Sequence, residues 1–454
     1  MNKDDKQFTS DRRDFMKTVA LGSAAGLMGL PDLNAATHYE TPSYANAMAP
    51  VKIRNCKAIA TRPGGSNLIV VKVETTEPGL YGVGCATFTQ RAFPVVTAIE
   101  QYMNDFCVGR DVDNIEDMWQ AFYVSSYWRN GPVLNNAISG LDQALWDIKG
   151  KRAGMPVYQL LGGKCRFAVP LYAHASGREP AQVVDNVKRF MDQGFKHIRI
   201  QLGGYGGVGT GTGLNPDFRA AGFGLERDGF MDERAYVKGT IQIFDAVRKA
   251  CGEDIELLHD VHERLQPMDV IYLCKQLEQY RPFFIEDPLS PENTAWWKQL
   301  RESTTVPFAM GELFNNINEF LQPMVNHYFD YIRIHISQIG GITPAMKVAR
   351  LGEWFNVRTA WHGPGDVSSV GHAANAHISL ATWNFGILEG GYQFADNERV
   401  VFPGTPTHKD GNLYVNEAPG LGVDVNETEA AKFPINNRAP GWTIRRYDGT
   451  IIRP

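Results

Sequence analysis

Three carboxylates recur at equal intervals in this chain, each directly after a short apolar run. They are Asp260, Glu286 and Glu312, and both intervals are 26 residues. A strand, a helix and two loops take about that length in a barrel of alternating strands and helices. Acids at the same phase of three successive units would therefore lie at the same mouth of the barrel. Oxygen ligands in that position favour a hard divalent cation, Mg²⁺ above all.

Beyond Gly163 the chain alternates between short β-like runs and amphipathic segments. Such alternation predicts parallel strands joined by crossover helices. Seven or eight strands within roughly 230 residues fit a closed barrel better than an open sheet, so we expect an α/β barrel domain over residues 166–400. The predicted strands are Val169–Ala173, His197–Gln201, Glu256–His259, Phe283–Glu286, Phe308–Glu312, Tyr331–His335 and Val357–Trp361.

The sequence on either side of this barrel has a different pattern. Alternation over residues 51–83 predicts an antiparallel meander, and periodicity over 95–106 and 135–153 predicts helices. We therefore expect an α+β capping domain over residues 50–165. The segment 401–454 is rich in Pro, Asn and Gly, and we expect it to pack on the capping domain. The glycine-rich stretch Gly203–Gly224 predicts a mobile loop over the barrel mouth.

The N-terminus has the pattern of an export signal. Arg12 and Arg13 precede an apolar, small-residue run from Thr18 to Leu30. This order is typical of a twin-arginine signal peptide, which we place at residues 1–36. The apolar run, about 13 residues long, is too short for a membrane span. The sequence therefore predicts a periplasmic protein.

Charge and cysteine usage narrow the possible partners. A net charge of −5 argues against a general nucleic-acid surface, so an anionic ligand needs a local cluster of cations or a metal. The six cysteines show no C-x-x-C spacing, which argues against a zinc site or a thioredoxin-like centre.

Histidine and arginine accompany the three acids. His262 lies two residues beyond Asp260, on the same face if the strand continues, and an imidazole there can act as a general acid or base. By the same reasoning Asp287, next to Glu286, should point away from the mouth. Arg199 and a second arginine, at position 333, lie inside apolar runs and need acidic or anionic partners, since an unpaired charge there is costly.

Further polar residues follow later strand-like runs. His362 and Asp366 come just after Trp361 and could orient one another or bind hydroxyls, and Glu389 ends another run. A cation at a barrel mouth, surrounded by such groups, suits removal of a proton α to a carboxylate, because the developing enediolate is stabilised. His262 could then protonate a departing β-hydroxyl.

At this level of detail the chain resembles the enolase superfamily, and in particular its mannonate dehydratase group, which includes the starvation-sensing proteins. The resemblance covers roughly residues 51–425. It is carried by the motifs Tyr127-Trp128-Arg129-Asn130-Gly131-Pro132, Ala144-Leu145-Trp146-Asp147-Ile148-Lys149, Tyr158-Gln159-Leu160-Leu161-Gly162-Gly163, His259-Asp260-Val261-His262, Glu286-Asp287-Pro288, Gly311-Glu312 and His362-Gly363-Pro364.

The resemblance implies a modified TIM barrel of the (β/α)7β type with an α+β N-terminal capping domain. It also implies that Asp260, Glu286 and Glu312 bind Mg²⁺, that His262 is the acid that assists water loss, and that the protein is a homo-oligomer. The residues that match positions contacting the sugar acid are Asn67, His174, Arg333, His362, Asp366 and Glu389.

One position departs from the family pattern. Active dehydratases of the group pair the arginine matching Arg199 with a tyrosine twelve residues later, which forms the base, whereas this chain has Gly211 there. Tyr205 is the nearest tyrosine and a candidate catalytic residue. The Lys-x-Lys of the muconate-cycloisomerase branch is also absent, since the corresponding stretch is Arg199-Ile200-Gln201.

Three hypotheses follow from this pattern. The first is a Mg²⁺-dependent dehydratase that converts an aldonic acid, such as mannonate or gluconate, to its 2-keto-3-deoxy acid. The second keeps the enediolate but not the elimination, as in an epimerase or a cycloisomerase acting on an anhydro sugar acid. The third is an exported binding or sensing protein without turnover. Intact His262 and His362 argue against the third hypothesis.

Overall fold

The computed structural model describes residues 50–203, 229–390, 393–436, 443–446 and 448–453. Everything below concerns the unit Val51–Pro454. The predicted signal peptide, Tyr205 and Gly211 lie outside the described residues. Among the residues that are described, no helix has the length and apolar character needed to cross a membrane.

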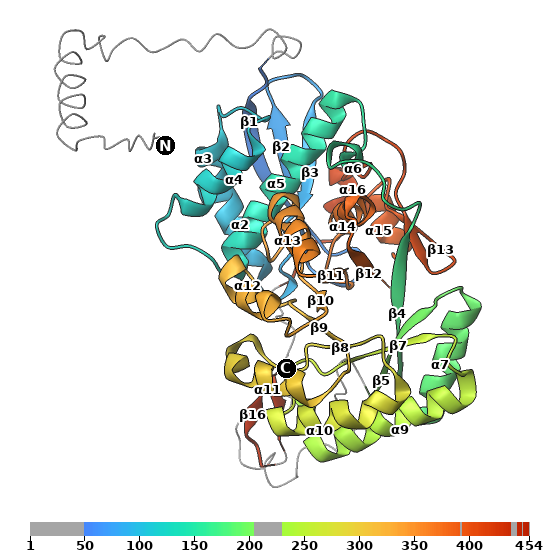
Figure 1. The fold of residues 1–454 in the computed structure, drawn as a ribbon. Coiled ribbons are helices and arrows are strands. Elements are labelled where there is room, and N and C mark those ends of the chain that lie inside the picture. Colours follow the sequence, from blue (N-terminus) through green and yellow to red (C-terminus); the bar gives the residue numbers. More distant parts are fainter. Residues whose placement is uncertain (1–49, 204–228, 391–392, 437–442, 447, 454) are drawn as a thin grey trace, which may run out of the picture. The chain divides into compact units, whose positions relative to one another are not determined.

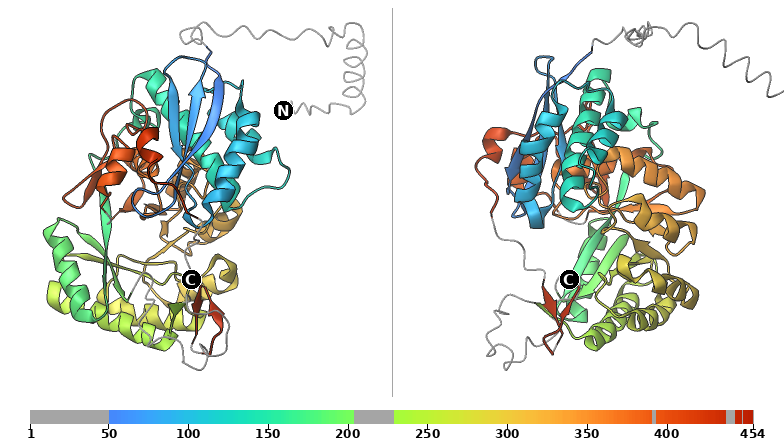
Figure 2. Two further views of the ribbon diagram at one scale, coloured as in Figure 1. Left: turned by 180° about the vertical axis from the view of Figure 1, so that it is seen from behind. Right: turned by 90° about the vertical axis from the view of Figure 1, so that its left-hand side faces the viewer.

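The first part of the unit is a three-stranded antiparallel meander covered by helices (Figures 1 and 2). Its strands are β1 (Ile53–Thr61), β2 (Leu68–Thr75) and β3 (Tyr81–Cys85), in the order β1-β2-β3. The helices that follow are α2 (Ala92–Ala98), α3 (Asn104–Cys107), α4 (Ile115–Val124), α5 (Pro132–Ala153) and α6 (Val157–Leu160), with a π-helical turn over Ile99–Met103 between α2 and α3.

Strand β3 and helix α5 approach one another closely because β3 carries glycines at the contact. A Cβ atom on Gly82 would lie 2.1 Å from the Ala144 carbonyl oxygen, and one on Gly84 would lie 2.0 Å from that of Gly140. Both separations are far below van der Waals contact, so a larger side chain would force the strand and helix apart. The capping domain therefore depends on these two small residues.

The second part is a closed barrel of eight parallel strands. Their order is β4-β5-β7-β8-β9-β10-β11-β12, and pairing of β12 with β4 closes the ring. The strands are β4 (Val169–Gly177), β5 (His197–Leu202), β7 (Glu256–Asp260), β8 (Phe284–Glu286), β9 (Phe308–Met310), β10 (Tyr331–Ile332), β11 (Arg358–Trp361) and β12 (Phe385–Glu389).

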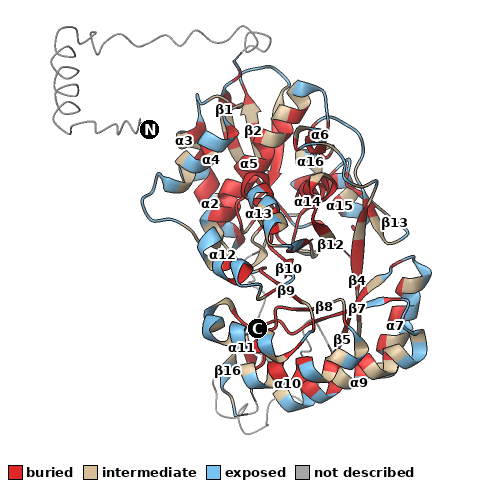
Figure 3. Ribbon diagram, viewed as in Figure 1, coloured by how far each residue is buried: buried red, intermediate tan, exposed pale blue. Residues whose placement is uncertain are grey.

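Within the described residues, one helix follows each of the first seven barrel strands. They are α7 (Pro180–Asp192), α9 (Glu233–Cys251), α10 (Pro267–Leu277), α11 (Thr294–Ser303), α12 (Ile317–Val325), α13 (Ile342–Trp354) and α14 (Ser369–Ala381). Their apolar faces pack against the barrel, and the strands between them are almost entirely buried (Figure 3). This architecture confirms the predicted (β/α)7β barrel with an α+β capping domain.

The period-two alternation of the barrel strands sets one apolar layer beneath one charged layer. The apolar layer is formed by Tyr172, Leu258, Phe284, Ala309, Tyr331, Ala360 and Ile387. Alternate residues of a strand share a face. Three residues of the apolar layer are therefore followed, two positions later on the same face, by a carboxylate. These pairs are Leu258 with Asp260, Phe284 with Glu286, and Ile387 with Glu389.

Helix α14 contains a histidine buried at a junction with the C-terminal part of the chain. His377 Nδ1 accepts a hydrogen bond from the Tyr158 backbone N–H at 3.2 Å, so Nε2 carries the proton and donates to the Leu421 carbonyl at 3.1 Å. Burial lowers the pKa of His377 to about 4. A second ring proton, on Nδ1, would also face the backbone N–H of Tyr158, which disfavours the charged ring. This histidine is therefore a neutral structural residue.

The C-terminal segment packs on both domains. It contains α15 (Asp396–Val401), the hairpin β13 (Thr407–Lys409) and β14 (Asn412–Tyr414), and α16 (Glu427–Ala430). The hairpin extends the sheet next to β4. Near α16, the Ala430 carbonyl accepts from Thr61 Oγ1 at 2.9 Å, and Glu427 pairs with Lys72 at 2.7 Å. This part of the segment therefore contacts the capping domain.

The last residues do not follow the predicted placement on the capping domain. Strand β15 (Ile444–Arg445) pairs in parallel with β6 (Gly229–Phe230), which precedes barrel helix α9, and antiparallel with β16 (Ile451–Ile452). Arg446 donates twice to Glu233, at 2.9 Å in both hydrogen bonds. Backbone pairing and this ion pair hold the end of the chain on the barrel, which corrects the prediction for residues 443–453.

Candidate active site

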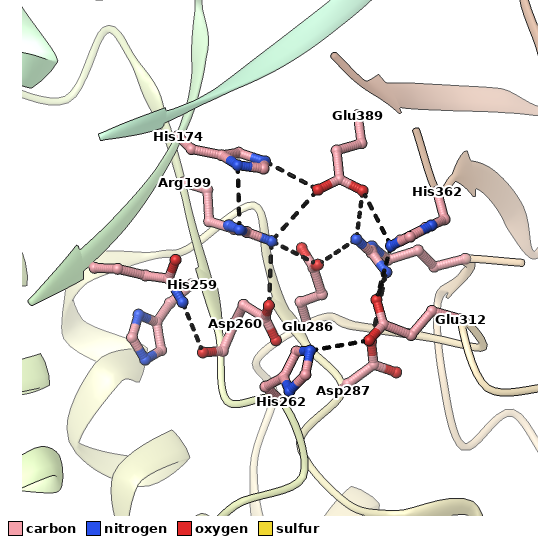
Figure 4. Close-up of polar contacts among 12 residues, drawn as sticks. His174, Arg199, His259, Asp260, His262, Glu286, Asp287, Glu312, His362 and Glu389 are labelled. Carbon is pink, nitrogen blue, oxygen red and sulfur yellow. Dashed lines mark hydrogen bonds and ion pairs between the residues drawn. The ribbon is translucent and has the colours of Figure 1, made fainter. Parts of the chain in front are cut away.

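Arg199 on β5 is the first of two arginines that hold buried acids together (Figure 4). Its Nη1 atom lies 3.1 Å from Asp260 Oδ2, 3.0 Å from Glu286 Oε1 and 3.6 Å from Glu389 Oε1. All four side chains have no measurable exposure. Arg199 was predicted to have acidic partners inside the barrel, and its guanidinium pairs with three carboxylates there.

Arg333, directly after β10, is the second arginine and contacts even more acids. Its Nη2 atom lies 2.6 Å from Glu286 Oε1 and 2.6 Å from Glu389 Oε2, while Nη1 lies 3.6 Å from Asp287 Oδ2 and contacts Glu312. These charges raise the pKa of Arg333 further above its ordinary value, although burial opposes the shift. The two arginines thus bring together acids from four different strands and loops.

The carboxylates of the cluster outnumber its guanidinium groups. Four carboxylates (Asp260, Glu286, Glu312 and Glu389) face two guanidinium groups. Burial raises the pKa of Asp287 well above its ordinary value, and Glu312 adds to the shift, so a fifth negative charge is disfavoured there. A divalent cation would add positive charge among these carboxylates.

The buried oxygens of the cluster fit such a cation. Among the described residues, Asp260 Oδ1 and Asp287 Oδ2 are buried and accept no hydrogen bond. Oxygen atoms of Asp260, Glu286 and Asp287 lie within 4.8 Å of one another. A converging set of carboxylate oxygens is what Mg²⁺ prefers in proteins. Glu312 lies beside this set and is linked to it through Arg333.

Asp287 was expected to point away from the mouth if its strand continued past Glu286, and the strand does not continue. Strand β8 ends at Glu286, and Asp287 takes a positive φ of 38°, which turns its side chain back toward the acids. Its Oδ1 atom accepts a hydrogen bond from the Gly311 N–H at 3.3 Å. The following Pro288, which cannot donate to a strand ladder, was the available sign that the strand stops here.

Two histidines approach the two oxygens of Glu312. His262 Nε2 lies 3.2 Å from Oε1, and His362 Nε2 lies 3.2 Å from Oε2. Burial disfavours both imidazolium ions, but Asp260 and Glu312 outweigh it at His262 and raise its pKa to about 9. At His362 burial and Arg333 are outweighed by Glu389 and Glu312, and the pKa is again raised. The site thus holds two proton-transfer groups on one carboxylate.

His262 reaches the cluster by a route that differs from the prediction. Strand β7 ends at Asp260 and does not continue to His262, which takes a φ of 54°. A left-handed turn, and not continued strand alternation, therefore brings the imidazole to Glu312. Such a turn leaves no clear mark in the sequence, because the two residues involved are not glycines.

The remaining predicted residues fall into two groups. His174 Nε2 lies 3.0 Å from Glu389 Oε1, and Asp366 has a carboxylate oxygen within 4.8 Å of a ring nitrogen of His362. Asn67 instead exchanges two hydrogen bonds with the backbone of Asn436, at 3.0 and 3.2 Å. The structure thus brings His174 and Asp366 to the cluster, whereas the side chain of Asn67 is used to hold the C-terminal segment.

Sequence reasoning missed one further member of the site. The Tyr172 hydroxyl donates to Glu286 Oε2 at 3.1 Å and accepts from Arg333 Nε at 3.3 Å, and the whole side chain is buried. It lies on β4 two residues before His174, on the same interior face. That spacing was the signal that could have identified it.

Comparisons with known proteins agree with this fold and site. The family model described as "Mandelate racemase / muconate lactonizing enzyme, N-terminal domain" matches residues 39–162, and "Enolase C-terminal domain-like" matches residues 182–429. An enolase structure from Pantoea ananatis with bound D-gluconate and Mg has a TM-score of 0.84 and 48% identity, and the match covers 89% of this chain and 100% of that one.

Curated relatives identify the family within this superfamily. The D-galactonate dehydratase family member RspA of Pantoea ananatis is 50% identical over 424 residues, and a family member from Enterococcus gallinarum is 49% identical over 408 residues. Each match covers 90% of this chain and 100% of the relative. The chain belongs to the enolase superfamily and, within it, to the D-galactonate dehydratase family. It is a sugar-acid dehydratase, and thus a hydro-lyase.

Proposed function

We propose that this protein removes water from an aldonic acid of the gluconate or mannonate class and releases the 2-keto-3-deoxy acid. The observation that carries the proposal is the pair of histidines, each 3.2 Å from Glu312, beside the buried acids of the barrel mouth. Proton removal and hydroxyl loss each need one proton-transfer group. The D-gluconate in the related structure from Pantoea ananatis supports this substrate class.

Mg²⁺ is the cofactor, and Asp260, Glu286 and Glu312 are the residues proposed to hold it. When bound, the ion supplies positive charge that stabilises the enediolate formed from the substrate carboxylate. Asp287 adds a fourth carboxyl group at the same place, within 4.8 Å of Asp260 and Glu286. Arg199 and Arg333 keep these acids together and add positive charge beside the substrate carboxylate.

The two histidines are assigned opposite tasks. His362 takes the proton from the carbon next to the carboxylate, and Asp366 has a carboxylate oxygen within 4.8 Å of a ring nitrogen of His362. His262, on the other oxygen of Glu312, donates a proton to the β-hydroxyl as that group leaves as water. His174 and Glu389, which contact one another, are proposed to bind substrate hydroxyls. Tyr205 remains a candidate base outside the described residues.

A test follows directly from these assignments. The mature chain is incubated with Mg²⁺ and a library of sugar acids, and 2-keto-3-deoxy products are measured. His262→Asn should abolish product, and His362→Asn should abolish both product and exchange of the α-proton with solvent deuterium. His327→Asn is the matched control, because His327 is exposed. Product formation by either active-site variant at the wild-type rate would contradict the assignment.

The second candidate function is epimerisation or cycloisomerisation of a sugar acid, and Gly211 in place of the family tyrosine favours it. The same incubation separates the two, since deuterium uptake at the α-carbon without loss of water supports the isomerase. Saturable binding with neither outcome supports a sensing protein.

We further propose that residues 1–36 direct export to the periplasm and that the protein is a homo-oligomer. The paired arginines Arg12 and Arg13 ahead of an apolar run support the first proposal. Replacing both with lysine should leave the protein in the cytoplasmic fraction. Light scattering of the mature chain tests the second proposal, and a monomeric mass contradicts it.

A further inference from the structure

Two consecutive non-glycine residues adopt left-handed backbone conformations at the end of β7. His262 has a φ of 54° and Glu263 a φ of 61°. The turn is held by hydrogen bonds from the Glu263 N–H to the Asp287 carbonyl at 2.9 Å and from the Val261 N–H to the Glu286 carbonyl at 3.0 Å. Strained backbone of this kind persists where the surrounding structure enforces it, and it concentrates at ligand-binding sites.

The turn places the carboxyl group of Glu263 in an unusual environment. The residue is only 9% exposed, and its Oε1 atom is buried and accepts no hydrogen bond from any described residue. Burial raises the pKa of Glu263 to about 8, and the charge of Glu312 adds to the shift. A buried acceptor without a donor lowers the stability of the folded protein, so folding alone does not explain why a carboxyl group lies here.

Glu263 follows His262 directly in the turn, and charges of the site act on it. In addition to the effect of burial, its pKa is raised by Glu312 and Glu292 and lowered by His262 and Arg453. Arg453 lies 3.8 Å from Glu292, so this arginine already has a carboxylate partner. A structural salt bridge therefore does not account for the buried Oε1 atom of Glu263.

We infer that Glu263 is a substrate-binding residue that accepts hydrogen bonds from the hydroxyl groups beyond the β-carbon of the sugar acid. This inference rests on the proposed function. In that function His262 stands at the β-hydroxyl, and Glu263 is the next residue along the same turn. The polyol end of an aldonic acid offers hydroxyl donors there, which satisfy the buried oxygen without adding charge.

The test compares a six-carbon aldonic acid with glyceric acid, which has an α- and a β-hydroxyl but nothing beyond them. For Glu263→Ala, the ratio of kcat/KM values for the long and short acids should fall about 3- to 10-fold, as expected for loss of a hydrogen bond to a neutral carboxyl group. Glu292→Gln is the matched control and should keep the wild-type ratio, because the charge of Glu292 also acts on Glu263 but its side chain is 71% exposed. An unchanged ratio in Glu263→Ala overturns the inference.

Two additions keep the experiment decisive. Glu263→Gln retains the shape and one acceptor oxygen, so it should fold if the alanine variant does not, and its ratio should fall by a smaller factor. Calorimetric binding of both acids to the Mg²⁺-loaded protein reads the same preference without turnover. If the wild type binds aldonic acid but neither dehydrates it nor exchanges its α-proton, the proposed function fails, while the binding preference still decides the role of Glu263.

Discussion

Replacing Arg333 with methionine should destabilise the protein far more than removal of an ordinary ion pair. Methionine keeps much of the side-chain volume but removes a charge that lies 2.6 Å from Glu286 and 2.6 Å from Glu389 and also contacts Glu312. Arg333 is fully buried, so water cannot take over the role of the lost charge. The variant therefore leaves several buried carboxylates with a single guanidinium, that of Arg199.

The expected loss is about 3–5 kcal/mol in the free energy of unfolding at pH 7, the usual cost of removing one partner from a buried ion pair. Urea unfolding of the metal-free protein, followed by circular dichroism, measures it. The matched control is Arg54→Met, because Arg54 is 66% exposed and its 3.3 Å pair with Glu74 should contribute only about 0–1 kcal/mol. A loss below about 1 kcal/mol for Arg333→Met would refute the reasoning.

The sign of the pH dependence gives a second check on the same variant. Despite burial, Arg333 lowers the pKa of Glu312 and of Glu389 well below their ordinary values. A lowered carboxyl pKa contributes stability above the unfolded pKa, roughly 4.3, and that stability is lost as the pH falls through the folded value. The difference in the free energy of unfolding between wild type and Arg333→Met should therefore be largest at pH 7 and decrease below about pH 4. A difference that increases as the pH falls contradicts this electrostatic origin.

Three further predictions concern other parts of the molecule. Tyr172→Phe removes the hydroxyl that orients Glu286, so Mg²⁺ affinity measured by calorimetry should fall about 10- to 100-fold; unchanged affinity argues against this role. Wild-type stability should fall as the pH drops from about 6.5 to 4, at most by about 1.4 kcal/mol per unit from the lowered pKa of His377, and His377→Gln should flatten this part of the profile. Gly84→Ala should cost about 1–3 kcal/mol in urea unfolding, because the added Cβ would lie 2.0 Å from the Gly140 carbonyl oxygen; an unaffected midpoint contradicts the close packing.

The acids of the site could be predicted because they depend on features that sequence records directly. Asp260 and Glu286 are register partners on neighbouring parallel strands, and each follows an apolar interior residue by two positions. Equal spacing along the chain therefore becomes adjacency in space. The arginines were predictable for a related reason, since a charge inside an apolar strand run implies buried partners, and Arg199 has three of them.

What could not be predicted depends on backbone turns beyond the strand ends. Asp287, His262 and Glu263 all have positive φ values, and that of Asp287 turns its side chain to the side that strand alternation does not give. The side chain of Asn67 contacts Asn436, which lies 369 residues away, and no local pattern encodes such a contact. The return of β15 to the barrel is of the same kind, because it is set by pairing with β6.

The charge balance of the site also links the binding of its ligands. Arg199 and Arg333 allow four carboxylates to share one buried space, and His262, whose pKa is raised to about 9, adds a positive charge beside Glu312. A Mg²⁺ ion at these carboxylates adds further positive charge where the substrate carboxylate must lie, and charges interact strongly in a medium of low dielectric constant. The sugar acid should therefore bind more tightly with the cation than without it. The polyol end of the substrate carries no charge, so a buried acceptor such as Glu263 can recognise it independently of the cation.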